Sequence, residues 1–285
     1  MMKLSVFTVC TPDLTPEQLI TAAAAAGIEG IEWRYAGIPA DAAEESPSYW
    51  RHNRCSLDPD MSSERLQMIR LAVEQERMRS IALVPYLKCG DLDKAHQAFD
   101  TAQQLGATMM RVGVPRYDRQ RHYEDLETEA VRYLSSIQEM ASQYGIKALV
   151  ETHHETIAPS ASLAMRLVGH LNPAHVGVLY DPGNLVHEGY ENYLMGIQLL
   201  GPYLAHVHIK NAGWIRSSDG RWQCEWMPLL EGSVSWTQLV ADLAAAGYDG
   251  YLGVEDFSGQ FGSAEMLQHF ANVFREQLQQ HGQEV

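Results

Sequence analysis

Four side chains of the types that bind metal ions each end a short apolar run of the sequence. The runs end in Glu151, Asp181, His208 and Glu255, and polar, glycine or proline residues follow within two positions of each. A short apolar run with such boundaries is typical of a buried β-strand. If the four strands are parallel neighbours, their carboxyl ends share one face, and the four side chains converge there. The sequence therefore predicts a metal site.

Three carboxylates and one imidazole form a hard set of oxygen and nitrogen ligands. Such a set suits one divalent ion (Mn, Mg, Co or Zn) and leaves positions open for substrate oxygens. His206 and His208 point the same way because residues two apart in a strand share a face, and only His208 reaches the rim. Taken alone, Asp181 before Pro182 fits a helix cap equally well. The repetition of the pattern in four runs favours the metal site.

The chemistry expected of this site is proton transfer next to a carbonyl group. A divalent metal polarises a substrate hydroxyl or carbonyl, which makes the neighbouring carbon acid more acidic. Glu151 or Glu255 can then remove a proton on one face of the substrate, and the other glutamate can return it. We therefore predict these two residues as the catalytic pair.

Apolar strand-like runs alternate with amphipathic helical segments along the whole chain. The strands are expected at 4–8, 30–34, 80–85, 109–114, 147–151, 176–181, 205–208 and 251–255, with helices between them, a last helix at about 263–280 and a frayed tail at 280–285. Eight such pairs predict an α/β fold, a single (β/α)8 TIM barrel over residues 1–285 with its active site at the carboxyl ends of the strands. An open, doubly wound sheet is the alternative.

The composition excludes several classes of function. The 21 Lys and Arg residues against 36 Asp and Glu give a net charge of −15, which repels nucleic acid. No run approaches the roughly 18 apolar residues of a membrane span, and residues 1–8 lack the pattern of a signal peptide. We therefore expect a cytoplasmic protein. The four cysteines form no CxxC pair, which favours reduced thiols.

The ends of the four runs resemble a known family. The motifs are Val150-Glu151, Tyr180-Asp181-Pro182-Gly183-Asn184, His206-Val207-His208-Ile209-Lys210 and Val254-Glu255, in this order. They look like the xylose isomerase-like TIM-barrel superfamily (sugar phosphate isomerase/epimerase family), and residues 27–33 are similar to its first helix end and second strand. For the ketose 3-epimerases of this family, the resemblance implies that the matching Glu, Asp, His and Glu bind one metal and that the two glutamates exchange the proton.

Two positions depart from the epimerase pattern. Where those epimerases carry a substrate-binding His three residues after the metal Asp, this chain has Asn184. Where they carry an Arg six residues after the metal His, it has Trp214, with Arg216 two places later. Other branches of the superfamily, which include inosose dehydratases, hydroxypyruvate isomerases and enzymes of 3-keto glycosides, use the same enediolate chemistry. We expect these positions to select the substrate.

Further residues are candidates for substrate binding by their position at the rim. The full set is His153, Asn184, His187, Lys210, Trp214, Arg216 and Arg34. His153 follows the Glu151 strand, whereas His187 could equally begin the next helix. Lys210 lies two residues past His208, so it either faces the site or caps a helix. Arg34 shares a strand face with Glu32, where the two residues could contact substrate or form an internal ion pair.

Other candidates lie at the expected rim. Arg111 and Arg116, near the end of the fourth strand, could bind a phosphate or carboxylate. Four tryptophans also lie in segments expected at the rim, where an aromatic face can stack on a sugar, although core packing is the more probable role for any one of them. They are Trp33, Trp214, Trp222 and Trp226. The segment 213–228 is either a substrate-facing loop or a subunit contact.

The leading hypothesis is a divalent-metal-dependent isomerase or epimerase of a keto-sugar or related polyol, acting through a metal-stabilised enediolate. A dehydratase or lyase acting on an inosose or 3-keto glycoside is the alternative with the same site. A nuclease resembling AP endonuclease would need a basic groove, which the net charge of −15 disfavours. A sugar-binding barrel without activity is the remaining alternative. The expected partner is a small carbohydrate, and a homo-oligomer is possible.

Overall fold

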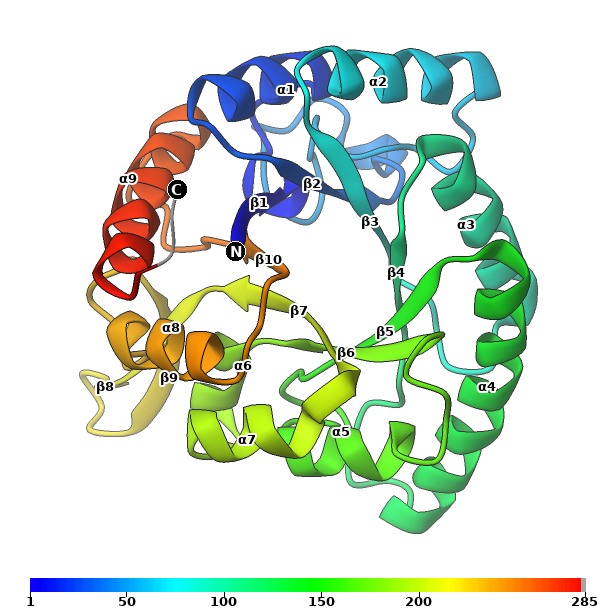
Figure 1. Cartoon of the computed structure of the whole chain (residues 1–285), viewed down its shortest axis with the longest axis vertical. Coiled ribbons are helices and arrows are strands. Elements are labelled where there is room, and N and C mark those ends of the chain that lie inside the picture. The colour runs from blue at the N-terminus through cyan, green and yellow to red at the C-terminus, as the bar shows by residue number, and fades with distance from the viewer. Residues whose placement is uncertain (283–285) are drawn as a thin grey trace.

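Eight parallel strands form a closed barrel in the computed structural model, which describes residues 1–282 (Figure 1). Around the barrel the order is β1, β10, β7, β6, β5, β4, β3 and β2. The strands are β1 (Lys3–Phe7), β2 (Gly30–Tyr35), β3 (Arg79–Pro85), β4 (Met109–Val112), β5 (Lys147–Glu151), β6 (Val176–Tyr180), β7 (Leu204–Ile209) and β10 (Tyr251–Val254). The predicted (β/α)8 fold is confirmed, whereas the organisation of residues 1–285 as one domain stays a prediction.

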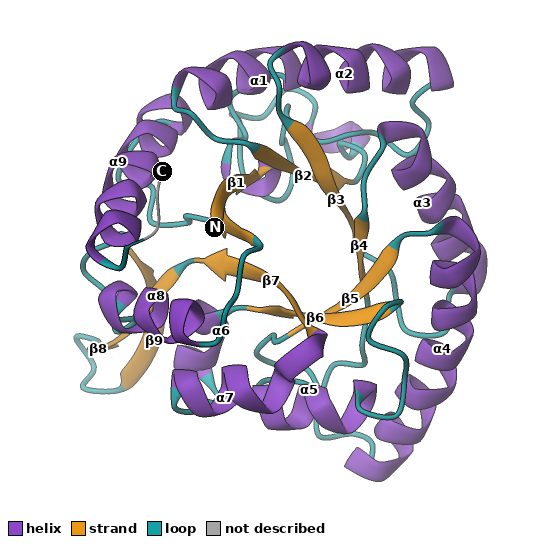
Figure 2. Cartoon of the chain, viewed as in Figure 1, coloured by secondary structure: helices purple, strands orange, loops and turns teal. Residues whose placement is uncertain are grey.

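Helices form an outer ring around the strands (Figure 2). They are α1 (Pro16–Ala25), α2 (Ser63–Gln75), α3 (Leu92–Leu105), α4 (Tyr123–Tyr144), α5 (Ala161–Val168), α7 (Tyr193–Leu200), α8 (Trp236–Ala245) and α9 (Ser263–Gln280). No helix within residues 1–282 has both the length and the apolar character that crossing a bilayer requires.

The helix boundaries follow from local sequence. At the start of α1, the Thr15 side chain accepts a hydrogen bond from the Gln18 backbone, and the Gln18 side chain accepts one from the Thr15 backbone. This reciprocal pair satisfies two amides that the first turn leaves free. Gly106 and Gly145 end α3 and α4 with φ of 72° and 66°. Glycine adopts this left-handed conformation without steric cost, so these helices end where the sequence predicts.

Side chains of β2 alternate between the inside of the barrel and the helix layer. Glu32 and Arg34 are buried on the inner side, whereas Trp33, between them, points the opposite way. Trp33 is fully buried, and its indole N–H donates to Ser80 Oγ on β3 at 2.9 Å. Trp33 therefore packs in the core, the more probable outcome for any one of the four tryptophans, because the alternation of the strand turns it away from the barrel interior.

Three features of the carboxyl face differ from the expected layout. β6 and β10 end one residue before Asp181 and Glu255, and β7 continues one residue past His208. A short helix, α6 (Pro182–His187), follows β6 directly. The segment expected at 213–228 is mostly an antiparallel hairpin of β8 (Asn211–Arg216) and β9 (Trp222–Met227). Of the tail predicted to fray, residues 283–285 lie outside the described residues.

Candidate metal centre

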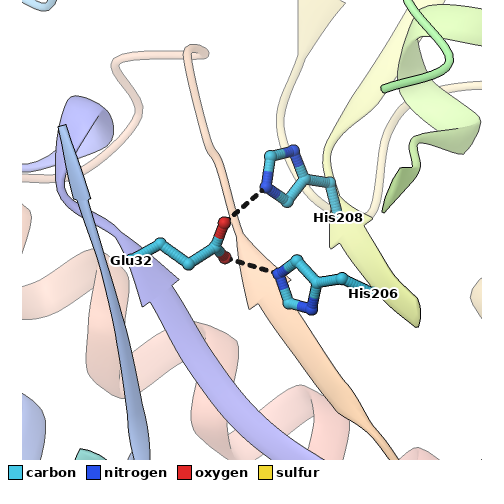
Figure 3. A group of neighbouring side chains, drawn as sticks. All are labelled: Glu32, His206 and His208. Atoms are coloured by element: carbon cyan, nitrogen blue, oxygen red, sulfur yellow. Dashed lines mark hydrogen bonds and ion pairs between the residues drawn. The ribbon is translucent and has the colours of Figure 1, made fainter. Parts of the chain in front are cut away.

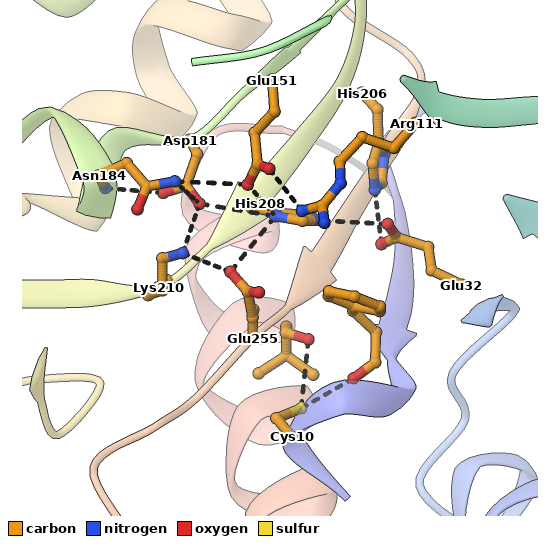
Figure 4. Close-up of polar contacts among 12 residues, drawn as sticks. Cys10, Glu32, Arg111, Glu151, Asp181, Asn184, His206, His208, Lys210 and Glu255 are labelled. Atoms are coloured by element: carbon orange, nitrogen blue, oxygen red, sulfur yellow. Dashed lines mark hydrogen bonds and ion pairs between the residues drawn. The ribbon is translucent and has the colours of Figure 1, made fainter. Parts of the chain in front are cut away.

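The four predicted ligands meet at the carboxyl end of the barrel (Figure 4). One ligand atom from each of Glu151, Asp181, His208 and Glu255 lies within 4.8 Å of those of the others. They come from the end of β5, the residue after β6, the end of β7 and the residue after β10. All four are at most 6% exposed. The barrel brings together residues that span more than one third of the chain.

His208 Nδ1 shows that this group fits a cation. This nitrogen is buried and has no hydrogen-bond partner among residues 1–282. It lies 3.5 Å from Asp181 Oδ2, 3.5 Å from Glu255 Oε2 and 3.6 Å from Glu151 Oε1. Burial opposes a charge on this ring, but the surrounding carboxylates raise the pKa of His208 well above its ordinary value. One nitrogen and three oxygens in a strongly negative field suit a divalent ion.

The other face of the His208 ring contacts a buried carboxylate (Figure 3). His208 Nε2 lies 3.0 Å from Glu32 Oε2, and His206 Nε2 lies 2.6 Å from Glu32 Oε1. All three side chains are completely buried. Glu32 is therefore bonded to the two histidines, and the internal ion pair with Arg34, one of the two alternatives for these residues, does not form. Arg34 instead donates to Ser56 Oγ at 2.6 Å and to the Trp50 carbonyl at 2.8 Å.

Two cations balance the carboxylates. Arg111 Nη1 lies 2.6 Å from Glu151 Oε2, and Lys210 Nζ lies 2.8 Å from Asp181 Oδ2 and 2.5 Å from Glu255 Oε2. Burial alone raises the pKa of Glu151, but the Arg111 charge holds this pKa well below its usual range. Lys210 likewise lowers the pKa of Asp181 against the effect of burial. Both carboxyl groups are thus ionised at neutral pH.

Asn184, in the first turn of α6, contacts two of the predicted ligands. Its Nδ2 donates to Asp181 Oδ2 at 2.9 Å and lies 3.3 Å from Glu151 Oε1. Asp181 Oδ1 accepts from the Asn184 backbone at 2.9 Å, so Asp181 caps the helix with one oxygen and faces the site with the other. His154 Nδ1 lies 2.9 Å from Asn184 Oδ1. The helix-cap and site interpretations of Asp181 are therefore compatible.

Aromatic rings surround the mouth of the site. Lys210 Nζ lies 4.7 Å from the ring centre of Trp226 on β9 and 5.5 Å from that of Phe257. Trp50, from the long segment after β2, contacts both Phe257 and Tyr86. A cavity of about 320 Å³ opens beside Glu151 and is lined by residues that include Tyr86, Arg111, His153 and His154. This cavity is large enough for a small polar substrate.

The remaining candidates lie at different distances from the centre. His153 lines the cavity, and the His187 ring stacks on His154 at 4.3 Å between centroids. Burial lowers the pKa of His187 to about 4. Trp214 is half exposed, and its indole N–H donates to the Val186 carbonyl at 2.8 Å. Arg216 is exposed at the far end of the hairpin, where its Nε donates to the Gly220 carbonyl. The structure does not bring these last two residues to the four ligands.

Two aromatic residues of the site, Tyr86 and Phe257, also lie just past the ends of strands, although they were not among the predicted site residues. Tyr86 follows the last residue of β3, and Phe257 lies two residues past Glu255, so both occupy the rim by the same spacing that identifies the ligands. Trp50 lies in an irregular segment and has no such signal. Arg116, predicted as an anion-binding candidate, is exposed and forms an ion pair with Glu155.

Comparisons with known proteins agree with this architecture. The solved structure of an IOLI protein with a bound zinc atom is similar with a TM-score of 0.75 and 16% identity, covering 98% of this chain and 99% of that one. A probable 3-DHS dehydratase, AsbF from Bacillus anthracis, has a TM-score of 0.73 and 18% identity, covering 96% and 99%. D-psicose 3-epimerase from Clostridium cellulolyticum H10 has a TM-score of 0.70 and 15% identity, covering 99% and 100%. These likenesses show the fold.

A comparison with curated protein sequences found no match. The family model described as xylose isomerase-like TIM barrel, in contrast, matches residues 20–277. This match includes all four of the converging side chains and seven of the eight barrel strands. The chain therefore belongs to the xylose isomerase-like TIM-barrel family.

Proposed function

We propose that this protein is a divalent-metal-dependent enzyme that moves a proton on a carbon next to the carbonyl of a keto-sugar or related polyol, and so isomerises or epimerises it. The observation that carries the proposal is His208 Nδ1, which has no hydrogen-bond partner among residues 1–282 and faces an oxygen of each of three buried carboxylates. Glu151, Asp181, His208 and Glu255 would hold the ion. When bound, such an ion polarises a substrate carbonyl or hydroxyl.

The two glutamates can perform the proton transfer. Glu151 is kept ionised by Arg111, so it can accept a proton from the substrate carbon. Glu255 follows β10, which β7 and β6 separate from β5, and would deliver a proton taken up from solvent to the other face, while Glu151 releases to solvent the one it removed. Lys210 can donate a hydrogen bond to a substrate oxygen beside Asp181 and Glu255. Removal and return on opposite faces inverts the carbon, which is epimerisation.

The surroundings of the centre suit a carbohydrate. Trp226 and Phe257 offer aromatic faces beside Lys210, where the apolar side of a sugar ring can stack. Similar structures include one named as a D-psicose 3-epimerase with D-tagatose, and another contains zinc. The first supports a small carbohydrate as substrate, and the second supports a divalent ion as cofactor.

Elimination is the second candidate because of Lys210. Its ammonium group is buried beside Glu255 and could donate a proton to a departing oxygen. A similar structure is named as a probable 3-DHS dehydratase, which supports the same outcome. Mass spectrometry of the product separates the two reactions, since elimination releases water or an aglycone and epimerisation conserves mass.

Proton exchange with solvent tests the proposal. Metal-loaded protein is incubated in D₂O with a panel of ketoses, inososes and 3-keto glycosides, and deuterium uptake is followed by NMR. We expect uptake at the carbon next to the carbonyl, and Glu151→Gln and Glu255→Gln should abolish it at saturating metal. The matched control is Glu155→Gln, an exposed glutamate on the loop after β5, which should keep normal uptake. Undiminished uptake in either active-site variant would contradict the roles proposed, and a wild type without uptake would favour a sugar-binding barrel.

A further inference from the structure

A single carboxylate, Glu32 on β2, is shared by two imidazoles of β7. Its two oxygens lie 2.6 Å from His206 Nε2 and 3.0 Å from His208 Nε2, and none of the three side chains is exposed. Figure 3 shows Glu32 reaching across the barrel interior, with one oxygen toward each ring. A carboxylate can only accept hydrogen bonds, so each Nε2 carries the proton that is donated to Glu32.

This donation fixes which nitrogen of His208 faces the metal centre. When the proton is on Nε2, the lone pair of a neutral imidazole is on Nδ1. Nδ1 of His208 faces oxygens of Asp181, Glu255 and Glu151 at 3.5 to 3.6 Å. The same rule applies to His206, whose buried Nδ1 has no hydrogen-bond partner among residues 1–282. An unpaired lone pair there costs less than an unpaired buried N–H, which proteins rarely tolerate.

Gly253 provides an independent observation. This residue of β10 pairs with His208 in the sheet, and a Cβ built on it would lie 2.3 Å from Glu32 Oε1 and 3.0 Å from His206 Nε2. Real Cβ atoms do not approach another atom that closely. The φ of Gly253 is not among the positive values of the chain, so its conformation does not demand glycine. Its lack of a side chain leaves space for the Glu32 carboxylate.

We propose that Glu32 is a positioning residue for the metal ion, which holds His208 with Nδ1 toward the carboxylates in space that Gly253 leaves open. The inference rests on the proposed metal-dependent function and extends it to residues that do not touch the ion. Groups of this kind behind a ligating histidine commonly change metal affinity by about 10- to 100-fold.

The first test is the Mn²⁺ affinity of Glu32→Gln, measured by electron paramagnetic resonance of the free ion. The amide of glutamine offers one oxygen and one NH₂ group, so it cannot accept from both imidazoles. We expect the Kd for Mn²⁺ to rise about 10- to 100-fold. The matched control is Asp242→Asn, a buried carboxylate on α8 that bonds to Gln238. It should keep the wild-type Kd.

The second variant leaves Glu32 in place. Gly253→Ala adds a methyl group against Glu32 Oε1 and should weaken Mn²⁺ binding in the same direction. Its control is Gly177→Ala on β6, where a Cβ would lie 2.8 Å from Ala205 Cβ and thus crowds the fold away from Glu32. A general loss of packing would affect both alanine variants alike. A loss of metal affinity confined to Gly253→Ala supports the proposal.

Nitrogen NMR of ¹⁵N-histidine-labelled wild type loaded with Zn²⁺ reads the tautomer directly. We expect His208 to carry a proton on Nε2 and the ion on Nδ1. The opposite tautomer of His208 would overturn the role of Glu32. So would a Kd within twofold of wild type in both Glu32→Gln and Gly253→Ala, or the binding of two ions per chain. The wild type and the variants could bind Mn²⁺ as expected while the wild type exchanges no substrate proton. That result would contradict the proposed reaction and leave this inference standing.

Discussion

Replacing Arg111 by methionine should destabilise the protein measurably, because it leaves a buried carboxylate without its cation. Arg111 Nη1 lies 2.6 Å from Glu151 Oε2, and the two side chains are 14% and 6% exposed. Removal of one partner of a buried ion pair costs about 3–5 kcal/mol. Asn184 Nδ2, at 3.3 Å from Glu151 Oε1, remains as a donor, which places the expected loss near the lower end.

The loss in free energy of unfolding can be converted into a shift of the melting temperature, because the unfolding entropy scales with the length of the chain. An unfolding entropy of about 2.1 cal/mol/K per residue gives about 0.6 kcal/mol/K for 285 residues. A loss of about 3–5 kcal/mol therefore lowers the melting temperature by about 5–8 °C. Scanning calorimetry of chelator-treated protein measures this shift without a bound ion that would itself balance Glu151.

The control is Arg116→Met, which removes an exposed ion pair with Glu155. Exposed pairs contribute about 0–1 kcal/mol, so the melting temperature should change by less than about 2 °C. Adding Glu151→Gln to Arg111→Met removes the unpaired charge and should restore more than half of the loss. Equal shifts for the two arginine variants, or no recovery in the double variant, would refute the assignment of Arg111 as the partner that keeps Glu151 ionised.

Other predictions concern the mouth of the site, its histidines and the cysteines. Trp226→Ala should raise the KM for substrate by about 3- to 10-fold, since stacking contributes about 0.5–1.5 kcal/mol, and should leave the Mn²⁺ affinity unchanged. The control, Trp222→Ala at the exposed start of β9, should leave KM unchanged. Burial lowers the pKa of His187 from 6.5 to about 4, so its protonation favours the unfolded chain as pH falls through that range. Urea titrations should therefore show a smaller loss of stability between pH 7 and 4.5 for His187→Phe than for wild type. Burial raises the pKa of both Cys55 and Cys89 to about 12, so iodoacetamide at pH 8 should modify them only slowly in native protein, as mass spectrometry against urea-treated protein will show.

The barrel was predictable because its signals are local and repeated. Each strand is a short apolar run, and the capping of α1 and the glycines that end α3 and α4 stand where the sequence places them. The convergence of the four predicted ligands follows from the same pattern, because parallel strands end on one face. Single residues at the strand ends were misplaced by one, since Asp181 and Glu255 each follow the last residue of a strand and Asp181 caps α6.

The connections across the barrel could not be predicted from local sequence. Glu32 and His206 lie 174 residues apart, and their contact depends on which strands face each other across the barrel interior. Spacing alone allowed Glu32 to pair with Arg34, its neighbour on the same strand face. The closed barrel instead places the histidines of β7 opposite Glu32. Long-range pairing of this kind is a consequence of topology, which single-strand patterns do not encode.

The hairpin shows a second limit. The segment rich in tryptophan was predicted to face either the substrate or another subunit, and the register of its strands places Trp214, Trp222 and Trp226 on one face of the hairpin. Trp226 on β9 points toward Lys210, whereas Trp214 and Trp222 are 50% and 66% exposed. Composition identified the segment, but the residue at the site differs from the exposed ones by its place along the hairpin, because Trp226 pairs with the buried Ala212 and Trp222 pairs with Arg216 at the far end.

Titration of chelator-treated protein with Mn²⁺ tests the central claim most directly. The free ion is followed by electron paramagnetic resonance for the wild type and for His208→Ala. The convergence of Glu151, Asp181, His208 and Glu255 predicts one bound ion per chain in the wild type and a Kd at least tenfold higher in the variant. Absence of binding by the wild type, or equal binding by His208→Ala, would contradict the assignment of these four residues as a metal centre.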